Sequence, residues 1–341
     1  MGILKVISVA LQVLALSSSV GAAAERHSAL RPQSPRPAPA VQVTENRGVK
    51  IARITRDAWI GPMWQPDDSW DELVIDAHVT LTGNVLVPAT RKKPLVIRGK
   101  DRFTSRIVGT NTQEWLRTEN DLARRHSAIF VDTMAPVRIT NLTSRNPDKY
   151  HFVGYNHTQL HVDHVDILDD RLAYTTDGVA GGKGTTVSDA YIDTYDDAIK
   201  IYAPDMVIEN VTIVHNRNGA PLQFGWSDEE GSATIRNLTI IANEPEIYNQ
   251  GIFGRAAQIG HTNPQAASVM IDGLHVIVPE GRKRPPLFMW GTPDGQIVNN
   301  FTLTVTGLCS GTAAAYRDRS TLDIVPRGSE KGVTLITPDC R

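Results

Sequence analysis

Residues 207–213 read Val-Ile-Glu-Asn-Val-Thr-Ile, and residues 234–240 read Thr-Ile-Arg-Asn-Leu-Thr-Ile. In both stretches apolar and polar residues alternate on either side of an asparagine, which predicts two short β-strands joined at a bend. Asparagine and aspartate tolerate the left-handed backbone that a tight bend requires. The same unit recurs along the chain, with bend residues at Asn141, His164, Asp189, Asn210, Asn237, Asp272 and Asn300.

These bends follow one another at intervals of 21 to 35 residues. A unit that recurs every few tens of residues is typical of a solenoid, in which each repeat forms one coil. We therefore predict an all-β fold, a right-handed single-stranded parallel β-helix of roughly seven to ten coils. The alternative is a β-sandwich, whose strands would follow one another at about 8–12 residues.

The composition excludes several classes of protein. The chain has 341 residues, of which 41% are hydrophobic and 21% charged, and its net charge is −2. This much apolar material allows a sizeable core and argues against a wholly disordered chain. An electrostatic nucleic-acid binder would carry a strong basic excess, so we expect no nucleic-acid partner. Beyond the N-terminal segment no apolar run is long enough to span a bilayer, and we expect no membrane partner.

The N-terminal residues 1–24 resemble a secretory signal peptide. Lys5 is followed by an apolar stretch at 6–16, and Ala22-Ala23-Ala24 matches a cleavage site for such a peptide. The alternative is an N-terminal membrane anchor. A signal peptide predicts that the protein is secreted and extracellular.

The rest of the chain divides into two parts by composition. Residues 25–54 are interpreted as a proline-rich linker and N-terminal segment, because four prolines stand between positions 31 and 40. Residues 55–341 are then the β-helix domain, and the segment from Trp59 to Val87 is expected to supply its N-terminal cap or an extra small sheet. We expect a monomer, because a capped solenoid has no open end for a second copy.

Secretion gives meaning to two further sequence features. Cys309 and Cys340 are expected to form a disulfide, since oxidising compartments favour such pairs; the alternative is two separate buried thiols. Five Asn-x-Thr sequons are candidate glycosylation sites, or else turn asparagines, at Asn141, Asn156, Asn210, Asn237 and Asn300.

Three aspartates are the candidate catalytic groups. Asp177 stands 19 residues before the pair Asp196–Asp197, which is close to one coil, and equivalent residues on adjacent coils lie roughly 5 Å apart. Both members of the pair can face outward only if the strand is irregular there. Three close carboxylates repel one another, so at least one should keep its proton near neutral pH. A protonated acid beside an ionised one is what cleavage of a glycosidic bond requires.

The same residues allow less specific interpretations. An oxygen-rich cluster also suits Ca²⁺, and Asp-Gly and Asp-Asp are common in solvated turns. Downstream of the aspartates, Trp226 is a candidate exposed aromatic and His215 is interpreted as a surface histidine. Three basic clusters are interpreted as solvated loops, at residues 91–93, 124–126 and 282–284.

Residues 196–202, Asp-Asp-Ala-Ile-Lys-Ile-Tyr, followed by a strand-turn-strand unit and then Gln-Phe-Gly-Trp at 223–226, resemble the catalytic core of glycoside hydrolase family 49, the dextranases and isopullulanases. Thr-Asp-Gly at 176–178 also matches in type and spacing. The close resemblance covers roughly residues 174–226. That family is similar in fold to the polygalacturonases, which are parallel β-helices that cleave polysaccharides with inversion.

The resemblance implies roles for individual residues. Asp196 would be the general acid, while Asp177 and Asp197 would hold and activate the attacking water, without a metal or other cofactor. Inversion implies roughly 6.5–9.5 Å between the acid and base carboxyls. The candidate substrate-binding residues are Lys200, Tyr202, Arg217, Asn218, Gln223 and Trp226.

Two departures from these families bear on the substrate. The segment before the solenoid is too short for the N-terminal β-sandwich of the dextranase family. The His-Gly pair and the Arg-Ile-Lys tripeptide of polygalacturonases are missing. We therefore expect a glycosidase that cleaves a polysaccharide, with an α-glucan such as dextran preferred over galacturonan. The alternatives are a polysaccharide lyase or epimerase on the same fold, and a non-catalytic glycan-binding protein.

Overall fold

A computed structural model describes residues 39–109, 126–154, 158–170, 176–224, 230–255, 265–291, 301–308, 324–327 and 333–336. Several predictions concern other residues and lie outside this part of the chain. They are the signal peptide at 1–24, the disulfide between Cys309 and Cys340, the sequons at Asn156 and Asn300, the basic residues Arg124 and Arg125, and Trp226. Among the described residues no helix is long and apolar enough to cross a membrane.

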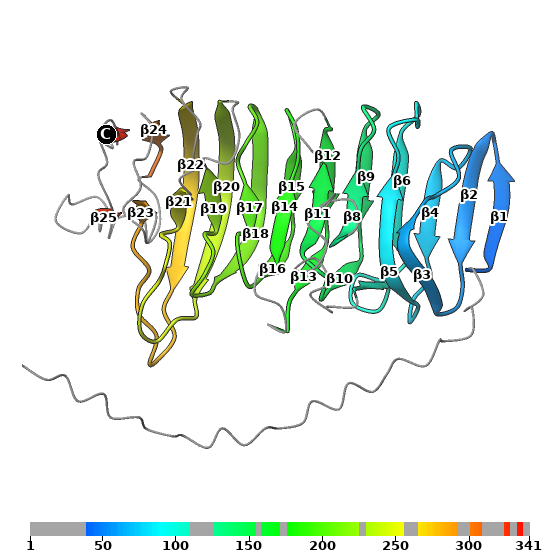
Figure 1. The fold of residues 1–341 in the computed structure, drawn as a ribbon, viewed down its shortest axis with the longest axis horizontal. Helices are drawn as coiled ribbons and strands as arrows, with labels where there is room; N and C mark the ends of the chain where they lie inside the picture. Colours follow the sequence, from blue (N-terminus) through cyan, green and yellow to red (C-terminus); the bar gives the residue numbers. More distant parts are fainter. Residues whose placement is uncertain are drawn as a thin grey trace, which may run out of the picture. The chain divides into compact units, whose positions relative to one another are not determined.

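The strands stack as a parallel β-helix with three faces (Figure 1). Face 1 consists of β2 (Val49–Ile54), β4 (Glu72–Ile75), β6 (Leu95–Gly99), β9 (Val137–Thr140), β12 (Leu160–Asp163), β15 (Thr186–Ser188), the first halves of β18 (Met206–His215), β20 (Gly231–Ala242) and β22 (Gln265–Ile277), then β24 (Phe301–Thr306) and β26 (Val333–Ile336). Face 2 consists of β7 (Arg106–Val108), β10 (Thr143–Arg145), β13 (Asp166–Leu168), β16 (Tyr191–Asp193) and the second halves of β18, β20 and β22.

Face 3 carries the candidate catalytic residues. It consists of β3 (Ala58–Trp64) and β5 (Thr80–Val87), which turn into it from face 2, then β8 (Ser127–Val131), β11 (Tyr150–Gly154), β14 (Asp177–Ala180), β17 (Ile199–Lys200), β19 (Leu222–Phe224), β21 (Phe253–Arg255), β23 (Phe288–Gly291) and β25 (Ile324–Arg327). Neighbouring strands within a face are parallel and come from successive coils, which confirms the predicted β-helix.

The period-2 alternation explains the core. On face 1 every second residue points inward and stacks on its counterpart one coil away, so that aliphatic side chains form a continuous column. This column is fully buried and runs through Ile97, Ile139, Val162, Val187, Ile208, Ile235 and Ile271. Each buried side chain contributes apolar burial at about 25 cal/mol per Å². Stability is therefore distributed over nearest-neighbour coils.

The predicted bends between faces 1 and 2 are confirmed. The backbone is left-handed at Asn141, His164, Asp189, Asn210 and Asn237, with φ between 49° and 55°. In the next coil Gly273, with φ 79°, makes the bend in place of the predicted Asp272, because glycine adopts this conformation most easily.

The sequon asparagines at these bends hold the coils together. Asn237 Nδ2 donates to Asn210 Oδ1 at 2.9 Å, and Asn210 Nδ2 donates to Asp189 Oδ1 at 3.2 Å. Asn141 Nδ2 donates to the carbonyl of Gly99 at 3.0 Å. The nitrogen that would carry a glycan is therefore engaged within the fold at all three described sequons, and glycosylation stays a prediction.

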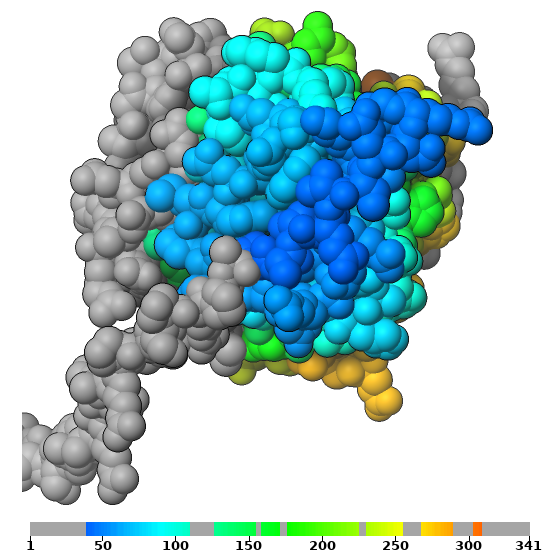
Figure 2. Space-filling view, turned by 90° about the vertical axis from the view of Figure 1, so that its right-hand side faces the viewer, coloured from blue at the N-terminus to red at the C-terminus, as the bar shows by residue number. Residues whose placement is uncertain are grey.

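The N-terminal end shows where the strands begin and differs from the prediction for the segment from Trp59 to Val87. Strands begin at β1 (Val41–Asn46), so the part of the 25–54 segment after residue 40 is strand and not linker. β1 pairs antiparallel with β2, and β2 pairs parallel with β4 of the next coil. This hairpin lies across the end of the solenoid (Figure 2), while the segment from Trp59 to Val87 forms coil strands.

Two basic clusters were misassigned in part. In the cluster at 124–126, His126 is buried and its Nδ1 contacts the Asp148 carboxylate, so the prediction of a solvated loop is wrong for His126. Arg91 is 1% exposed, and its guanidinium donates to the carbonyls of Trp70, Lys93 and Pro94, which belong to neighbouring segments. The prediction of a solvated loop at 91–93 is wrong for Arg91, because a long basic side chain can satisfy buried carbonyl groups. Residues 282–284 are exposed, as predicted.

Candidate active site

The three aspartates meet on face 3. Asp177 opens β14, and Asp196 and Asp197 stand in the irregular segment between β16 and β17. Val179 pairs with Ile199, so Asp177 lies one coil before Asp197. One carboxylate oxygen from each aspartate lies within 4.8 Å of the others. The cluster and the break in the strand both agree with the sequence-based expectation.

Backbone contacts hold Asp196 in the break. Its N–H donates to the carbonyl of Thr176 at 3.1 Å, and its carbonyl accepts from the Thr194 hydroxyl at 2.9 Å. The Thr176 hydroxyl accepts from the N–H of Tyr195 at 3.0 Å. These bonds replace the regular strand ladder and fix where the Asp196 side chain begins.

Gly219 packs directly against the Asp196–Asp197 peptide from the next coil. A Cβ at this position would lie 2.0 Å from the carbonyl carbon of Asp196 and 2.3 Å from the nitrogen of Asp197. Real Cβ atoms do not approach backbone so closely. The glycine is required here by close approach, which lets the following residue, Ala220, donate its N–H to Asp197 Oδ1 at 3.0 Å.

Lys200 neutralises two of the three carboxylates. Its Nζ lies 2.9 Å from Asp197 Oδ2 and 3.1 Å from Asp177 Oδ2, and 3.5 Å from the Tyr202 hydroxyl. Burial alone would lower the pKa of Lys200, but the charges of Asp177 and Asp197 outweigh it and raise this pKa well above its ordinary value. The lysine therefore stays an ammonium ion, and a charge-paired carboxylate favours its ionised form.

Asp196 is in a different electrostatic environment. It is half-buried, and among the described residues its carboxylate has no hydrogen-bond partner. Burial, followed by the charges of Asp197 and Asp177, raises the pKa of Asp196 well above its ordinary value. Burial also raises the pKa of Asp177, but there the Lys200 charge opposes the shift. The arrangement places a carboxyl whose raised pKa favours its protonated form beside two carboxylates that share one ammonium ion, which is a donor and acceptor pair for proton transfer.

The cluster could also present oxygen ligands to a metal ion. The Lys200 ammonium, however, occupies the side of Asp177 and Asp197 that a cation would bind. A Ca²⁺ ion at that position would meet a buried positive charge, which is unfavourable. The carboxylates of Asp177 and Asp197 are therefore better suited to the Lys200 ammonium than to a metal ion.

The other predicted substrate-binding residues are only partly in the site. Tyr202 adjoins Lys200, whose Nζ lies 5.5 Å from the centre of its ring. Asn218 is half-buried beside Gly219, and Arg217 is exposed at the neighbouring turn. Gln223 pairs in register with Lys200 but is only 1% exposed, and its Oε1 accepts from the Phe224 N–H. Gln223 thus lines the floor beside the site with almost no accessible surface.

The interpretation of His215 as a surface residue is wrong. It is 1% exposed and packs on Tyr248, with ring centres 4.4 Å apart. Burial lowers its pKa to about 3, so the ring is neutral. His215 stands at the end of β18, where buried and half-buried residues no longer alternate. The alternation of the sequence therefore did not predict that its side chain is buried.

The sequence analysis missed Lys149 and Tyr150. The Lys149 carbonyl accepts from the Asp177 N–H at 3.1 Å, so this segment lies one coil before Asp177. Lys149 Nζ lies 5.0 Å from the centre of the Tyr150 ring. Burial lowers the pKa of Lys149, while the charge of Asp177 opposes this shift. Counting one coil backward from the aspartates would have found both residues.

The separation of the carboxyl groups bears on the stereochemical course. Inversion implies roughly 6.5–9.5 Å between acid and base carboxyls. In the cluster one oxygen from each aspartate lies within 4.8 Å of the others, which is a distance between single oxygens and not between carboxyl groups.

Comparisons with known proteins agree with this geometry. The family model described as glycosyl hydrolases family 28 matches residues 71–245. A dextranase from Arthrobacter sp. (strain CB-8) is 27% identical over 135 residues, which are 37% of this chain and 21% of that protein. A dextranase from Arthrobacter globiformis is 26% identical over the same length. The match thus spans about a fifth of the length of these curated relatives.

A solved structure supports the fold alone. Dex49A from Penicillium minioluteum superimposes with a TM-score of 0.53 at 16% identity, and the alignment covers 91% of this chain and 65% of that one.

Proposed function

Because the chain belongs to glycosyl hydrolases family 28, whose model spans about half of it, we propose that it is a glycosidase that hydrolyses a polysaccharide at the Asp177–Asp196–Asp197 cluster. The observation that carries the proposal is the contrast within this cluster. Two carboxylates share the Lys200 ammonium, whereas the third has no such partner and keeps its proton.

Each residue of the cluster has its own role in the proposed reaction. Asp196 donates its proton to the glycosidic oxygen as the bond to the anomeric carbon breaks. A water molecule held by Asp177 and Asp197 attacks that carbon, and one of these carboxylates takes the proton of the water. Atoms balance as one water added for each bond cleaved: the base releases the proton it took from the water to solvent, and Asp196 regains one from solvent. The Lys200 ammonium pairs with both of these carboxylates and does not itself transfer a proton.

The stereochemical course is proposed to be inversion, as the family resemblance implies. The alternative is retention, in which one aspartate would attack as a nucleophile and the two carboxyl groups stand about 5–5.5 Å apart. Proton NMR of the first product distinguishes the two: inversion releases the opposite anomer to that of the cleaved bond, and retention releases the same one.

The proposed substrate is an α-glucan such as dextran, and the proposed location is extracellular. Support for the substrate comes from the two relatives described as dextranases. The missing polygalacturonase motifs also point away from galacturonan. Support for secretion comes from the composition of residues 1–24.

Release of reducing sugar tests the proposal. The protein would be incubated with dextran, pullulan, arabinan, galactan and polygalacturonate, each with and without EDTA. Asp196→Asn removes the acid, and Asp68→Asn, an exposed carboxyl in the N-terminal part, is the matched control. Release by the control but not by Asp196→Asn supports the hydrolase and identifies its substrate.

Two results would contradict it. A product with an unsaturated, ultraviolet-absorbing end would indicate a lyase. Retention of a polysaccharide without any product from wild-type protein would indicate a binding protein.

A further inference from the structure

A pocket lies on a face of the β-helix that does not carry the catalytic aspartates. It has a volume of about 230 Å³ and is lined by Phe103, Arg106, Thr143, Arg145, Asp166 and Leu168. Its walls come from β7, β10 and β13, which belong to face 2, whereas the catalytic aspartates lie on face 3. A typical small-molecule site occupies ~300–1,000 Å³, so this pocket suits one unit of a longer ligand.

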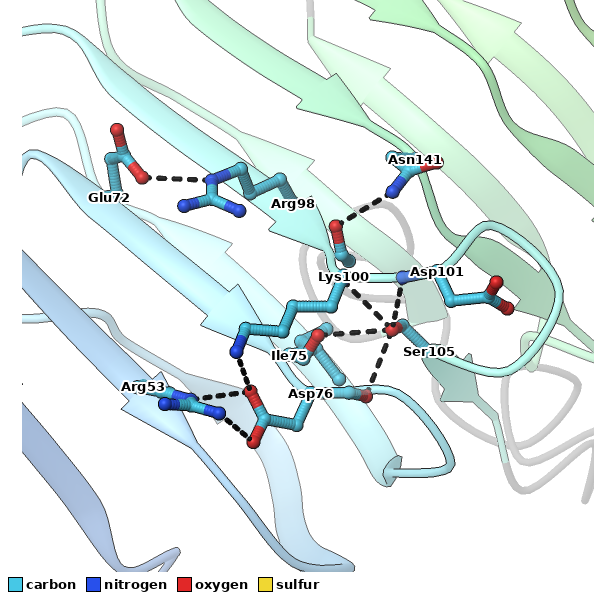
Figure 3. Close-up of polar contacts among 10 residues, drawn as sticks. Arg53, Glu72, Ile75, Asp76, Arg98, Lys100, Asp101, Ser105 and Asn141 are labelled. Carbon is cyan, nitrogen blue, oxygen red and sulfur yellow. Dashed lines mark hydrogen bonds and ion pairs between the residues drawn. The ribbon is translucent and has the colours of Figure 1, made fainter.

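An exposed aromatic ring is held in place at the edge of the pocket. Phe103 is 63% exposed, yet its N–H donates to Asp101 Oδ1 at 3.1 Å, and Thr104 donates its N–H to the same oxygen at 2.9 Å. The Ser105 hydroxyl ties the loop to the preceding coil: it accepts from the N–H groups of Lys100 and Asp101 and donates to the carbonyls of Ile75 and Asp76, as Figure 3 shows. The backbone that carries the ring is therefore fixed, and stacking on the ring needs little additional ordering of the loop.

Polar groups of both kinds face the same pocket. Arg102 Nε and Nη2 donate to Asp166 Oδ1 at 3.0 and 2.6 Å, which leaves Asp166 Oδ2 without a hydrogen-bond partner among the described residues. Arg106 Nε donates to the Phe103 carbonyl at 3.1 Å, and within the described part of the chain its terminal nitrogens have no partner. The pocket thus offers one accepting oxygen and two donating nitrogens beside an aromatic face.

This combination matches the chemistry of a sugar. A pyranose presents an apolar C–H face to an aromatic ring, and its hydroxyl groups donate and accept hydrogen bonds at its rim. A simple anion would meet the Asp166 carboxylate, and a simple cation would meet Arg106. A neutral polyhydroxyl ring satisfies both groups.

We propose that this pocket is a non-catalytic subsite that binds one sugar unit of a neutral polysaccharide. The inference rests on the proposed function, since it assigns to the pocket the polymer that the catalytic face cleaves. Because the two sites lie on different faces, the pocket anchors a distant part of the polymer and raises the local concentration of bonds near the aspartates.

Affinity electrophoresis in gels cast with dextran tests the proposal. Every variant carries Asp196→Asn, so that the polymer is bound but not cleaved. Phe103→Ala is expected to weaken retardation about tenfold, the ratio that corresponds to ~1.4 kcal/mol for loss of the exposed ring surface. Arg106→Gln is expected to weaken it as well. The controls are Met134→Ala, an apolar side chain 71% exposed outside the pocket, and Arg56→Gln, an exposed arginine of the N-terminal part.

Each outcome of the electrophoresis either supports or overturns the proposed subsite. Loss in the pocket variants but not in the controls supports the subsite. Equal mobility of Phe103→Ala and Met134→Ala overturns it, and so does a parent protein that dextran does not retard. Failure of the proposed function is seen separately, as absence of sugar release by the wild-type enzyme. In the otherwise wild-type background, Phe103→Ala should lower hydrolysis of dextran while leaving that of short oligosaccharides unchanged.

Discussion

Replacing Gly219 by alanine should disable the catalytic cluster without touching a carboxylate. The added Cβ would lie 2.0 Å from the carbonyl carbon of Asp196, and ordinary carbon contacts are about 3.5–4.0 Å. The Asp196–Asp197 peptide must therefore retreat by about 1.5 Å, since the neighbouring atoms are backbone and cannot rotate away. A misplacement of this size lowers the rate of a positioned reaction about 100-fold.

The assay compares the kcat of the alanine variant with that of wild type on the polysaccharide that wild type hydrolyses. Gly154→Ala is the matched control, because a Cβ there meets only side chains of Thr158 and Leu160, at 3.0 Å or more. Overpacking should also destabilise Gly219→Ala by about 1–3 kcal/mol, so rates are measured well below the melting temperature of both variants. A kcat within twofold of the control would refute the close-approach argument.

Other predictions follow from the charges of the site. Asp196→Asn should raise the melting temperature at pH 7: the raised pKa of Asp196 means that ionisation disfavours the folded state as pH rises. This gain should vanish below about pH 3.9, where the carboxyl is protonated both folded and unfolded; a gain that is independent of pH would contradict the assignment. In wild type, kcat should fall on the alkaline side as Asp196 loses its proton, and a pH–rate profile flat up to pH 9 would count against it as the acid. Lys200→Met should lower the free energy of unfolding by about 3–5 kcal/mol, because two buried carboxylates lose their counter-ion. Lys200→Arg should restore part of this stability. Unfolding in urea measures both variants, and a loss below about 1 kcal/mol for Lys200→Met would contradict the prediction. Hydrolysis should resist EDTA, since the Lys200 ammonium occupies the place of a metal, whereas loss of activity that Ca²⁺ restores would favour a calcium site.

The length of each coil determines which residues lie next to one another in the site. Asp177 and Asp197 lie together only because one coil separates them in the chain. The same register places Lys149 one coil earlier and Gly219 one coil later. An insertion or deletion in any of these coils would therefore shift a whole column of residues relative to the aspartates.

Local sequence was sufficient for the repeating architecture and for the candidate carboxylates. Alternation of apolar and polar residues depends on neighbours along the strand, and the left-handed bends depend on the bend residue itself, as Asn210 and Asn237 show. The grouping of Asp177 with Asp196 and Asp197 followed from the coil period, which is visible in the chain.

The tertiary structure alone decided how those groups are charged and what surrounds them. Whether Arg91 and His215 are buried depends on the segments that cover them, which come from distant parts of the chain. The sharing of Lys200 between two aspartates depends on side-chain directions on two adjacent coils. Alternation tells which way a side chain leaves its own strand, but burial and pKa are set by neighbours brought together only when the coils stack.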